Sequence, residues 1–371
     1  MKHAVLSASG SSRWLNCPGS RKAEEPFNGK DDSNVFAIEG THAHEVADLC
    51  LKNGRDADYY SKKKVLKKDV PAEMIRYVQE YLDYVRSHET DTSTLMTEER
   101  VDFSNVVPEG FGTMDAAVLD GKTAHIFDLK YGQGVQVEAF ENTQAQLYAL
   151  GLLNELSFLD EIEQFVIHIV MPRKSTPPPW TISVKDLILF GQHATERAEL
   201  AMTDSAPRVP GEKQCQWCKA KADCTALSSF VEETICAEFD DLDDISVDRL
   251  SDSKKKSIID NKKLIENFVN AVEAQAIERI INGDGFPGFK MVAGRSVRQW
   301  TEQAEEWLKK TLKAKAYNKK LIGIGDAEKL LGKGAADDYL TKPAGKPTLA
   351  PEHDKRQALT FDVTNEFDEL A

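Results

Sequence analysis

The chain has 371 residues, of which 41% are hydrophobic, and it carries a formal net charge of −14. This length and this hydrophobic fraction allow one large domain or two ordinary ones with a genuine core, which excludes a disordered or fibrous protein. The start of the sequence holds no apolar stretch of signal-peptide length, and no window approaches the ~18 continuous apolar residues that a membrane span needs. We therefore expect a cytoplasmic protein without a membrane segment.

The acidic balance argues against a protein that coats nucleic acid by bulk electrostatics, because neutralising phosphates requires clustered Lys and Arg. The acidic residues concentrate in residues 240–248 and at the end of the chain. A local basic cleft therefore remains compatible with the net charge. Carboxylates that hold divalent metals also contribute to an acidic balance.

Hydrophobic periodicity predicts an alternation of helices and strands in the first two thirds of the chain. A helix is expected after Pro71, which suits a first helical turn, and Asp120-Gly121 between two alternating runs predicts a hairpin. Pro177-Pro-Pro179 indicates an irregular connection. The expected helices are 39–51, 71–85, 140–156 and 184–202, and the expected strands are 95–103, 112–119, 123–130 and 164–170.

The composition changes beyond residue 240, where an acidic linker precedes a predicted long amphipathic helix, residues 253–282. A β-like stretch at 286–300 and further helix follow. A tail rich in Pro, Gly and Asp completes the sequence. No internal repeat of fixed period is present.

Two carboxylates and a lysine suit a metal-dependent phosphodiesterase: Asp115, Asp128 and Lys130. Asp128 and Lys130 project from one face of their strand because strand side chains alternate, and the predicted hairpin can bring Asp115 beside them. Carboxylate and water ligands suit Mg²⁺ or Mn²⁺, which supply a hydroxide and neutralise charge on the phosphate. Lys130 would orient the attacking water or stabilise the transition state. An isolated Asp-x-Lys is more often an ordinary cross-strand surface pair.

This motif is accompanied by His44 on the first predicted helix and by Gln144 and Tyr148, which share one face of a later helix. The order His, Gly-x-x-Asp, Asp-x-Lys, Gln-x-x-x-Tyr resembles that of the RecB-like branch of the PD-(D/E)XK nucleases, and so does the predicted element order. The resemblance implies an α/β fold with a mixed central sheet flanked by helices.

It also implies that His44, Asp115, Asp128 and the backbone carbonyl of Leu129 bind metal, and that Lys130 is the catalytic lysine. Gln144 and Tyr148 would then border the DNA and the scissile phosphate. Glu45, beside His44, is an alternative or additional ligand on the first helix.

Three of the six cysteines, Cys215, Cys218 and Cys224, lie in one short segment, and this spacing in a reducing cytosol favours metal binding over disulfides. Cys17 is the best candidate for a fourth ligand, because Cys50 lies on the apolar face of a predicted helix and Cys236 has no convincing place. Four thiolates suit a [4Fe–4S] cluster or Zn²⁺ equally.

The distant N-terminal cysteine resembles that of iron–sulfur nucleases such as AddB and the CRISPR-associated adaptation nucleases, which implies [4Fe–4S]. Such a cluster would clamp the two ends of the nuclease domain together.

The segment from Phe286 to Lys320 holds nine Lys or Arg against three Asp or Glu, with aromatic residues interleaved. This pattern is compatible with a surface that follows a DNA strand, centred on Lys290, Arg295 and Arg298, or with a solvated helix face at 309–320. The final residues alternate acidic and apolar side chains, which suits a partner-binding tail or a disordered end. The whole chain resembles an uncharacterised family of phage and prophage RecB-like nucleases, which implies a phage recombinase, annealing protein or single-strand-binding protein as partner.

The sequence therefore predicts a nuclease domain at 1–238 that includes the cysteine loop 210–226, an acidic linker at 239–252, a mainly helical accessory domain at 253–335 and a flexible tail at 336–371. The predicted function is a metal-dependent DNA exonuclease that resects DNA ends in phage recombination or repair. The alternatives are a catalytically quiet DNA- or partner-binding module that retains the fold, and a nuclease stapled by zinc without iron.

Overall fold

The computed structural model describes residues 4–27, 35–155, 162–236, 251–317, 321–332, 334–343, 345–351 and 354–360. The chain divides into two compact units, residues 1–268 and residues 269–371. Each unit is considered by itself. Among the described residues, no helix combines the length and the apolar character needed to cross a membrane.

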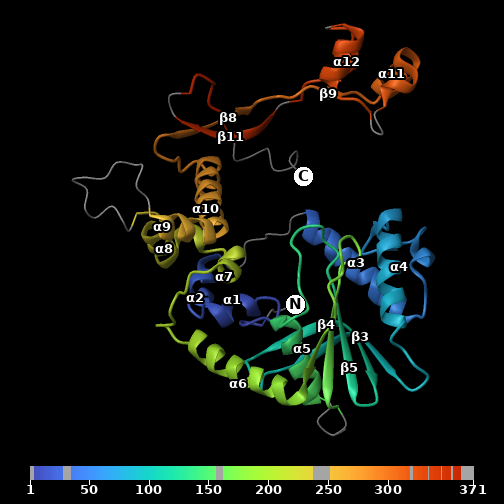
Figure 1. Ribbon diagram of the computed structural model, residues 1–371, viewed down its shortest axis with the longest axis vertical. Coiled ribbons are helices and arrows are strands. Elements are labelled where there is room, and N and C mark those ends of the chain that lie inside the picture. Colours follow the sequence, from blue (N-terminus) through green and yellow to red (C-terminus); the bar gives the residue numbers. More distant parts are fainter. Residues whose placement is uncertain are drawn as a thin grey trace. The chain divides into compact units, whose positions relative to one another are not determined.

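Unit 1 is built on a five-stranded mixed sheet with the strand order β3-β4-β5-β6-β7 (Figure 1). Neighbouring strands are antiparallel except for β5 and β6, which are parallel. Gly121 lies in the tight β4–β5 turn with φ of 54°, a left-handed conformation that glycine adopts without strain. The strands are β3 (Thr94–Asp102), β4 (Phe111–Asp120), β5 (Thr123–Leu129), β6 (Gln164–Val170) and β7 (Trp180–Ser183).

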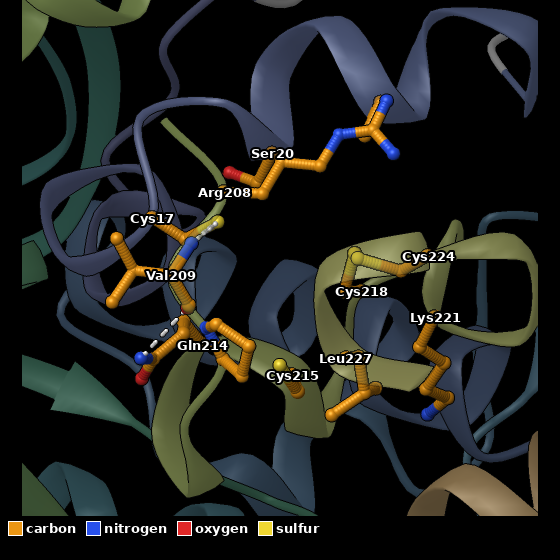
Figure 2. Close-up of a pocket in the computed structure, with 12 residues that line it drawn as sticks. Cys17, Ser20, Arg208, Val209, Gln214, Cys215, Cys218, Lys221, Cys224 and Leu227 are labelled. Carbon is orange, nitrogen blue, oxygen red and sulfur yellow. Dashed lines mark hydrogen bonds between the residues drawn. The ribbon is translucent and has the colours of Figure 1, made fainter. Parts of the chain in front are cut away.

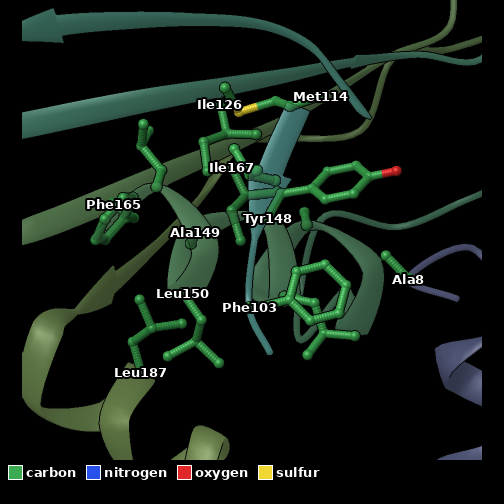
Figure 3. Close-up of a cluster of buried hydrophobic side chains, with 14 of the residues drawn as sticks. Ala8, Phe103, Met114, Ile126, Tyr148, Ala149, Leu150, Phe165, Ile167 and Leu187 are labelled. Atoms are coloured by element: carbon green, nitrogen blue, oxygen red, sulfur yellow. The ribbon is translucent and has the colours of Figure 1, made fainter. Parts of the chain in front are cut away.

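Helices cover both faces of this sheet, because alternate strand residues are apolar on both sides. On one face, Val118 and Phe127 belong to a buried cluster with α3 (Val35–Lys52) and α4 (Ala72–Arg86). On the other face, Ala117 and Ile126 pack with α5 (Thr143–Glu155) and α6 (Val184–Ala201). Figure 3 shows part of this second cluster, in which Ile126 and Ile167 of the sheet face residues of α5. The predicted mixed α/β fold with a central sheet flanked by helices is confirmed.

Short elements complete unit 1. The first segment of the chain forms two short helices, and further short helices surround the cysteine-rich segment. They are α1 (Ser11–Asn16), α2 (Ser20–Glu24), η1 (Glu25–Phe27), η2 (Ala57–Tyr60), β1 (Lys64–Val65), β2 (Lys68–Asp69), α7 (Glu212–Gln216), η3 (Lys221–Asp223), α8 (Thr225–Cys236) and α9 (Asp252–Asp260).

Each helix and strand expected before residue 202 is present, and the boundaries differ by a few residues. The predicted helix at 140–156 begins later, at Thr143, and its expected last residue lies outside the described residues. The irregular connection expected at Pro177-Pro-Pro179 is present, and it is followed by a strand that was not expected, β7 (Trp180–Ser183), on the free side of β6. Proline has no N–H to donate within a sheet, so a proline run can precede a short strand only at the edge of the sheet, where β7 lies.

The prediction of a single long helix at 253–282 was wrong. Its range holds α9 and α10 (Lys262–Ile281), which are separated at Asn261. Asn261 ends α9, with its side-chain amide donating to the carbonyl oxygen of Ser257. This local hydrogen bond competes with continuation of the helix.

Unit 2 contains two small antiparallel pairs, β8 (Phe289–Gly294) with β11 (Gly345–Pro351) and β9 (Gln299–Trp300) with β10 (Leu340–Thr341). Helices α11 (Ala304–Leu312) and α12 (Ile324–Leu331) share a small core with Trp300. Short helices η5 (Lys313–Ala316) and η6 (Asp337–Tyr339) follow them. Strands β10 and β11 lie within the range 336–371 that we expected to be a tail, and residues 361–371 lie outside the described residues.

Candidate metal centre

Asp115 and Asp128 lie where strands β4 and β5 separate. The pairing of the two strands ends at Ala116 opposite Phe127, so both carboxylates lie just beyond the last pair. One oxygen of Asp115, Oδ2, accepts a hydrogen bond of 2.7 Å from the backbone N–H of Leu129. The hairpin therefore brings the two carboxylates together, as the sequence analysis expected.

Lys130, Gln144 and Tyr148 continue from Asp128 in a chain of polar contacts. The Lys130 ammonium lies 3.0 Å from Oδ1 and 2.8 Å from Oδ2 of Asp128. It also donates to Oε1 of Gln144 at 3.2 Å, and Gln144 Nε2 donates to the Tyr148 hydroxyl at 3.1 Å. Lys130 is therefore held by Asp128 and by Gln144, and Tyr148 one turn later in α5 holds Gln144.

Gly112 explains the first residue of the Gly-x-x-Asp motif in physical terms. A Cβ atom at this position would lie 2.6 Å from Cε1 of Tyr148, far inside normal contact distance. The Tyr148 ring is buried against this backbone, and in Figure 3 its hydroxyl points away from the apolar cluster. Glycine at 112 is thus what allows Tyr148 to reach Gln144.

His44 is the residue of α3 that reaches the carboxylates. Its Nδ1 lies 3.0 Å from Oδ1 of Asp115, whereas within the described part of the chain no hydrogen bond or ion pair joins the half-buried Glu45 to either aspartate. Burial lowers the pKa of His44, but the charge of Asp115, the hydrogen bond to it and the charge of Asp128 together outweigh burial, and the net shift is upward. Of the two candidates on this helix, the structure brings His44 to the site.

Glu98 of β3 is a site residue that the sequence analysis missed. Glu98, His44 and Asp115 each offer one atom that could bind a metal, and these three atoms all lie within 4.8 Å of one another. Glu98 has φ of 45°, and the β3–β4 pairing passes from Thr97–Ala116 to Glu99–Met114 without a Glu98–Asp115 pair. A left-handed residue other than glycine costs about 1–2 kcal/mol, and such strain persists at functional sites.

Only weak sequence signals pointed to Glu98. It stands in a charged run, Glu98-Glu99-Arg100, inside an otherwise β-rich segment. Regular alternation cannot show which of two adjacent glutamates turns inward, because the answer depends on the irregular backbone at Glu98.

The burial of these carboxylates makes their charge costly without a cation. Burial raises the pKa of Asp128 although Lys130 opposes the shift, and burial together with the charge of Asp115 raises the pKa of Glu98 to about 7. The buried hydroxyl of Tyr81 interacts electrostatically with both aspartates and has no hydrogen-bond partner within the described part of the chain. Carboxylates, an imidazole and a buried hydroxyl without a partner fit a hydrated divalent cation.

Four cysteines from two distant segments line one pocket that is partly open to solvent, as Figure 2 shows: Cys17, Cys215, Cys218 and Cys224. Backbone N–H groups donate to two of the sulfurs, from Val209 to Cys17 at 3.2 Å and from Gly211 to Cys215 at 3.5 Å. Burial raises the pKa of the Cys218 thiol to about 12. Cys50 is buried in the core beside α4, away from this set.

The four sulfurs share a pocket but are not assembled around a point. In the residues that the structure describes, no three cysteine sulfurs lie within 4.8 Å of one another. Four thiolates on one zinc ion at ~2.3 Å would lie about 3.8 Å apart. The thiol donors and the N–H···S contacts are compatible with a metal group, but among the described residues the sulfurs are not gathered into a metal-binding cluster, so the expected clamp is not shown.

The three residues expected to contact DNA lie in unit 2. Lys290 is half-buried on β8, and Arg295 is exposed in the connection to β9. Arg298 is engaged by both carboxylate oxygens of Glu328 on α12. Arg298 thus has a structural partner inside unit 2.

Comparison with known proteins places this mixed α/β chain in a family. The family described as "Protein of unknown function (DUF2800)" matches residues 3–357, and the chain belongs to it. A solved crystal structure of a protein named SSO0001 is 13% identical, covers 61% of this chain and 88% of that chain, and has a TM-score of 0.30. A similarity this low carries no argument about function.

Proposed function

We propose that the chain is a metal-dependent DNA exonuclease of the RecB-like PD-(D/E)XK type, with Mg²⁺ or Mn²⁺ at the carboxylate centre. The observation that carries the proposal is the convergence of Asp115, Asp128 and Lys130 at the point where β4 and β5 separate. A phosphodiesterase needs carboxylates to hold a cation and an ammonium beside the reacting phosphate.

Each residue has a distinct task in this proposal. Asp115, Asp128 and the carbonyl of Leu129 hold the metal, and His44 and Glu98 complete its surroundings. A metal bound there lowers the pKa of a water molecule and neutralises charge on the phosphate oxygens. Lys130, oriented by Asp128 and Gln144, donates to the water or to the developing negative charge.

Gln144 and Tyr148 act mainly on Lys130 and on the approach of the DNA backbone. Burial raises the pKa of Tyr148 well above its ordinary value, so its hydroxyl is a neutral donor at physiological pH. A neutral hydroxyl can donate to a phosphate oxygen without repelling it. This hydroxyl also keeps the amide of Gln144 turned towards Lys130.

The four-cysteine pocket is proposed to hold a [4Fe–4S] cluster, with zinc as the alternative. Its structural role would be to tie the first segment of unit 1 to the segment after α6. Backbone contacts already join these segments, since Gly19 donates to the carbonyl of Pro207 at 2.9 Å. The family resemblance further suggests work beside a phage recombinase, annealing protein or single-strand-binding protein, with unit 2 as the contact region.

The test is degradation of linear and closed-circular DNA, single- and double-stranded, with Mg²⁺ or Mn²⁺ under anaerobic conditions. Linear substrates should be shortened from their ends and closed circles spared. Asp128→Ala and Lys130→Ala should each lower the rate by about 10²-fold or more. Lys122→Ala, which changes an exposed lysine at the far end of β5, should retain the wild-type rate.

Two results would contradict the proposal. One is wild-type protein that degrades none of these substrates while still binding DNA, which would favour a catalytically quiet binding module. The other is Asp128→Ala and Lys130→Ala variants as active as wild type. Cleavage of closed circles would support nuclease activity but contradict the exonuclease assignment, because a circle has no ends.

A further inference from the structure

A second cluster of metal-ligand side chains lies on the opposite face of β5 from Asp128. His88 follows the end of α4, His125 lies on β5 and His168 lies on β6. One ring nitrogen from each of these three histidines lies within 4.8 Å of the other two. Alternation along β5 places His125 on the other face of the strand from Asp128 and Lys130, so this cluster is separate from the carboxylate centre.

Hydrogen bonds to Tyr84 orient two of the three imidazoles. The Nδ1 atom of His88 lies 2.9 Å from the backbone carbonyl oxygen of Tyr84, which can only accept, so Nδ1 carries the proton. In the tautomer with its proton on Nδ1, the Nε2 atom of this ring has a free lone pair. The Nδ1 atom of His168 lies 3.0 Å from the Tyr84 hydroxyl, which can accept its proton in the same way.

This pattern is the one that histidine metal ligands use. A metal-bound histidine donates its outer ring N–H to an oxygen, and that bond fixes the tautomer and the ring orientation. Here a single residue, Tyr84, supplies both oxygens. Nδ1 of His125 and Nε2 of His168 lie 3.0 Å apart in a hydrogen bond that a bound metal would replace, and this separation is close to the ~3.4 Å between two nitrogens on one tetrahedral zinc ion.

Burial lowers the pKa of His125 and His168, and aromatic packing holds the rings in place. His168 is 3% exposed, and burial with the two neighbouring histidines lowers its pKa to about 3. The ring of Phe127 stacks on His168 with centroids 4.5 Å apart and forms the floor of the cluster. His88 and His125 are half-buried, which leaves an approach for solvent.

We propose that His88, His125 and His168 form a binding site for a divalent transition metal of the zinc type, with water as the fourth ligand. Neutral imidazole is a preferred ligand of Zn²⁺ and a poor one for Mg²⁺. The bound ion would join the end of α4 to two strands of the sheet. The proposal does not depend on the nuclease function, because it concerns metal binding alone.

The first experiment counts zinc on the full-length chain. Protein is first treated with a chelator and then loaded with Zn²⁺ in the presence of excess Mg²⁺, which competes for the carboxylate centre. Zinc per chain is then measured by mass spectrometry. His88→Gln and His125→Gln should each bind one zinc fewer than wild type. His193→Gln, which changes an exposed histidine on α6, should bind the wild-type amount. Equal zinc in all four proteins would overturn the site.

The second experiment uses wild-type protein, so it does not depend on variants that fold. Diethyl pyrocarbonate modifies accessible neutral histidines, and the modified positions are mapped by peptide mass spectrometry. Added Zn²⁺ should protect His88 and His125 at least tenfold while His193 stays reactive. Equal modification with and without Zn²⁺ would mean that the cluster is a hydrogen-bonded imidazole network only.

Discussion

Replacing Gly112 with alanine should destabilise unit 1 by about 2–3 kcal/mol. The new Cβ would lie 2.6 Å from Cε1 of Tyr148, about 1 Å inside an ordinary carbon–carbon contact. Overpacking of this size in a filled core costs about 1–3 kcal/mol. Moving the ring would also stretch its 3.1 Å hydrogen bond to Gln144, which contributes about 1 kcal/mol.

Urea unfolding followed by circular dichroism measures this change directly. Gly40→Ala is a matched control, because no atom lies within 4 Å of a Cβ built there and the residue is inside α3. That substitution should stabilise the protein by about 0.5–1 kcal/mol through helix propensity.

Combining Gly112→Ala with Tyr148→Leu should recover part of the loss, because the clashing ring is removed. A Gly112→Ala protein within about 0.5 kcal/mol of wild type would refute the reasoning, since it would show that the ring has room to move.

Two predictions concern the cysteines. Protein purified without oxygen should be brown and contain iron and sulfide. The Cys17→Ser variant should lose both, and the Cys50→Ala control should keep them. Colourless wild-type protein with stoichiometric zinc would contradict the cluster. Burial raises the pKa of Cys50 from its ordinary 9.0 to about 11, which lowers its thiolate fraction at pH 8 by ~100-fold. Because the side chain is also fully buried, iodoacetamide should label it at least ~100-fold more slowly than an exposed thiol, as measured by peptide mass mapping. Because the unfolded chain loses this proton first, the stability advantage of wild type over Cys50→Ala should shrink as pH rises from 9 to 11, and an advantage independent of pH would contradict the shift.

The order of elements in unit 1 was predictable because its helices and strands are long and strongly periodic. The hairpin at Asp120-Gly121 was predictable for a different reason, since the dipeptide has few other uses between alternating runs. Strand β7 was missed because its four residues follow three prolines, and pairing with β6 rather than local preference creates it. Helices α1 and α2 are too short to show a period.

The candidate centre was predictable only where residues are fixed by regular structure. Asp128 and Lys130 share a strand face, and Gln144 and Tyr148 share a helix face, so spacing alone indicated their neighbours. Glu98 was not predictable, because an interruption of the β3–β4 pairing turns its side chain inward.

The histidine cluster also escaped detection. Its members are separated by 37 and 43 positions and meet only when α4 packs on the sheet. No local pattern in the sequence connects them.

The contact between Cys17 and Val209 has a consequence for how the protein is made. The two residues are 192 positions apart, so the first segment emerges from the ribosome long before its partner exists. At ~5–20 residues per second, translation leaves this segment waiting for about 10–40 s. During that interval the thiol of Cys17 lacks both the N–H donor of Val209 and the pocket that surrounds its sulfur in the folded unit. Unit 1 therefore cannot finish folding until its last helices have been synthesised.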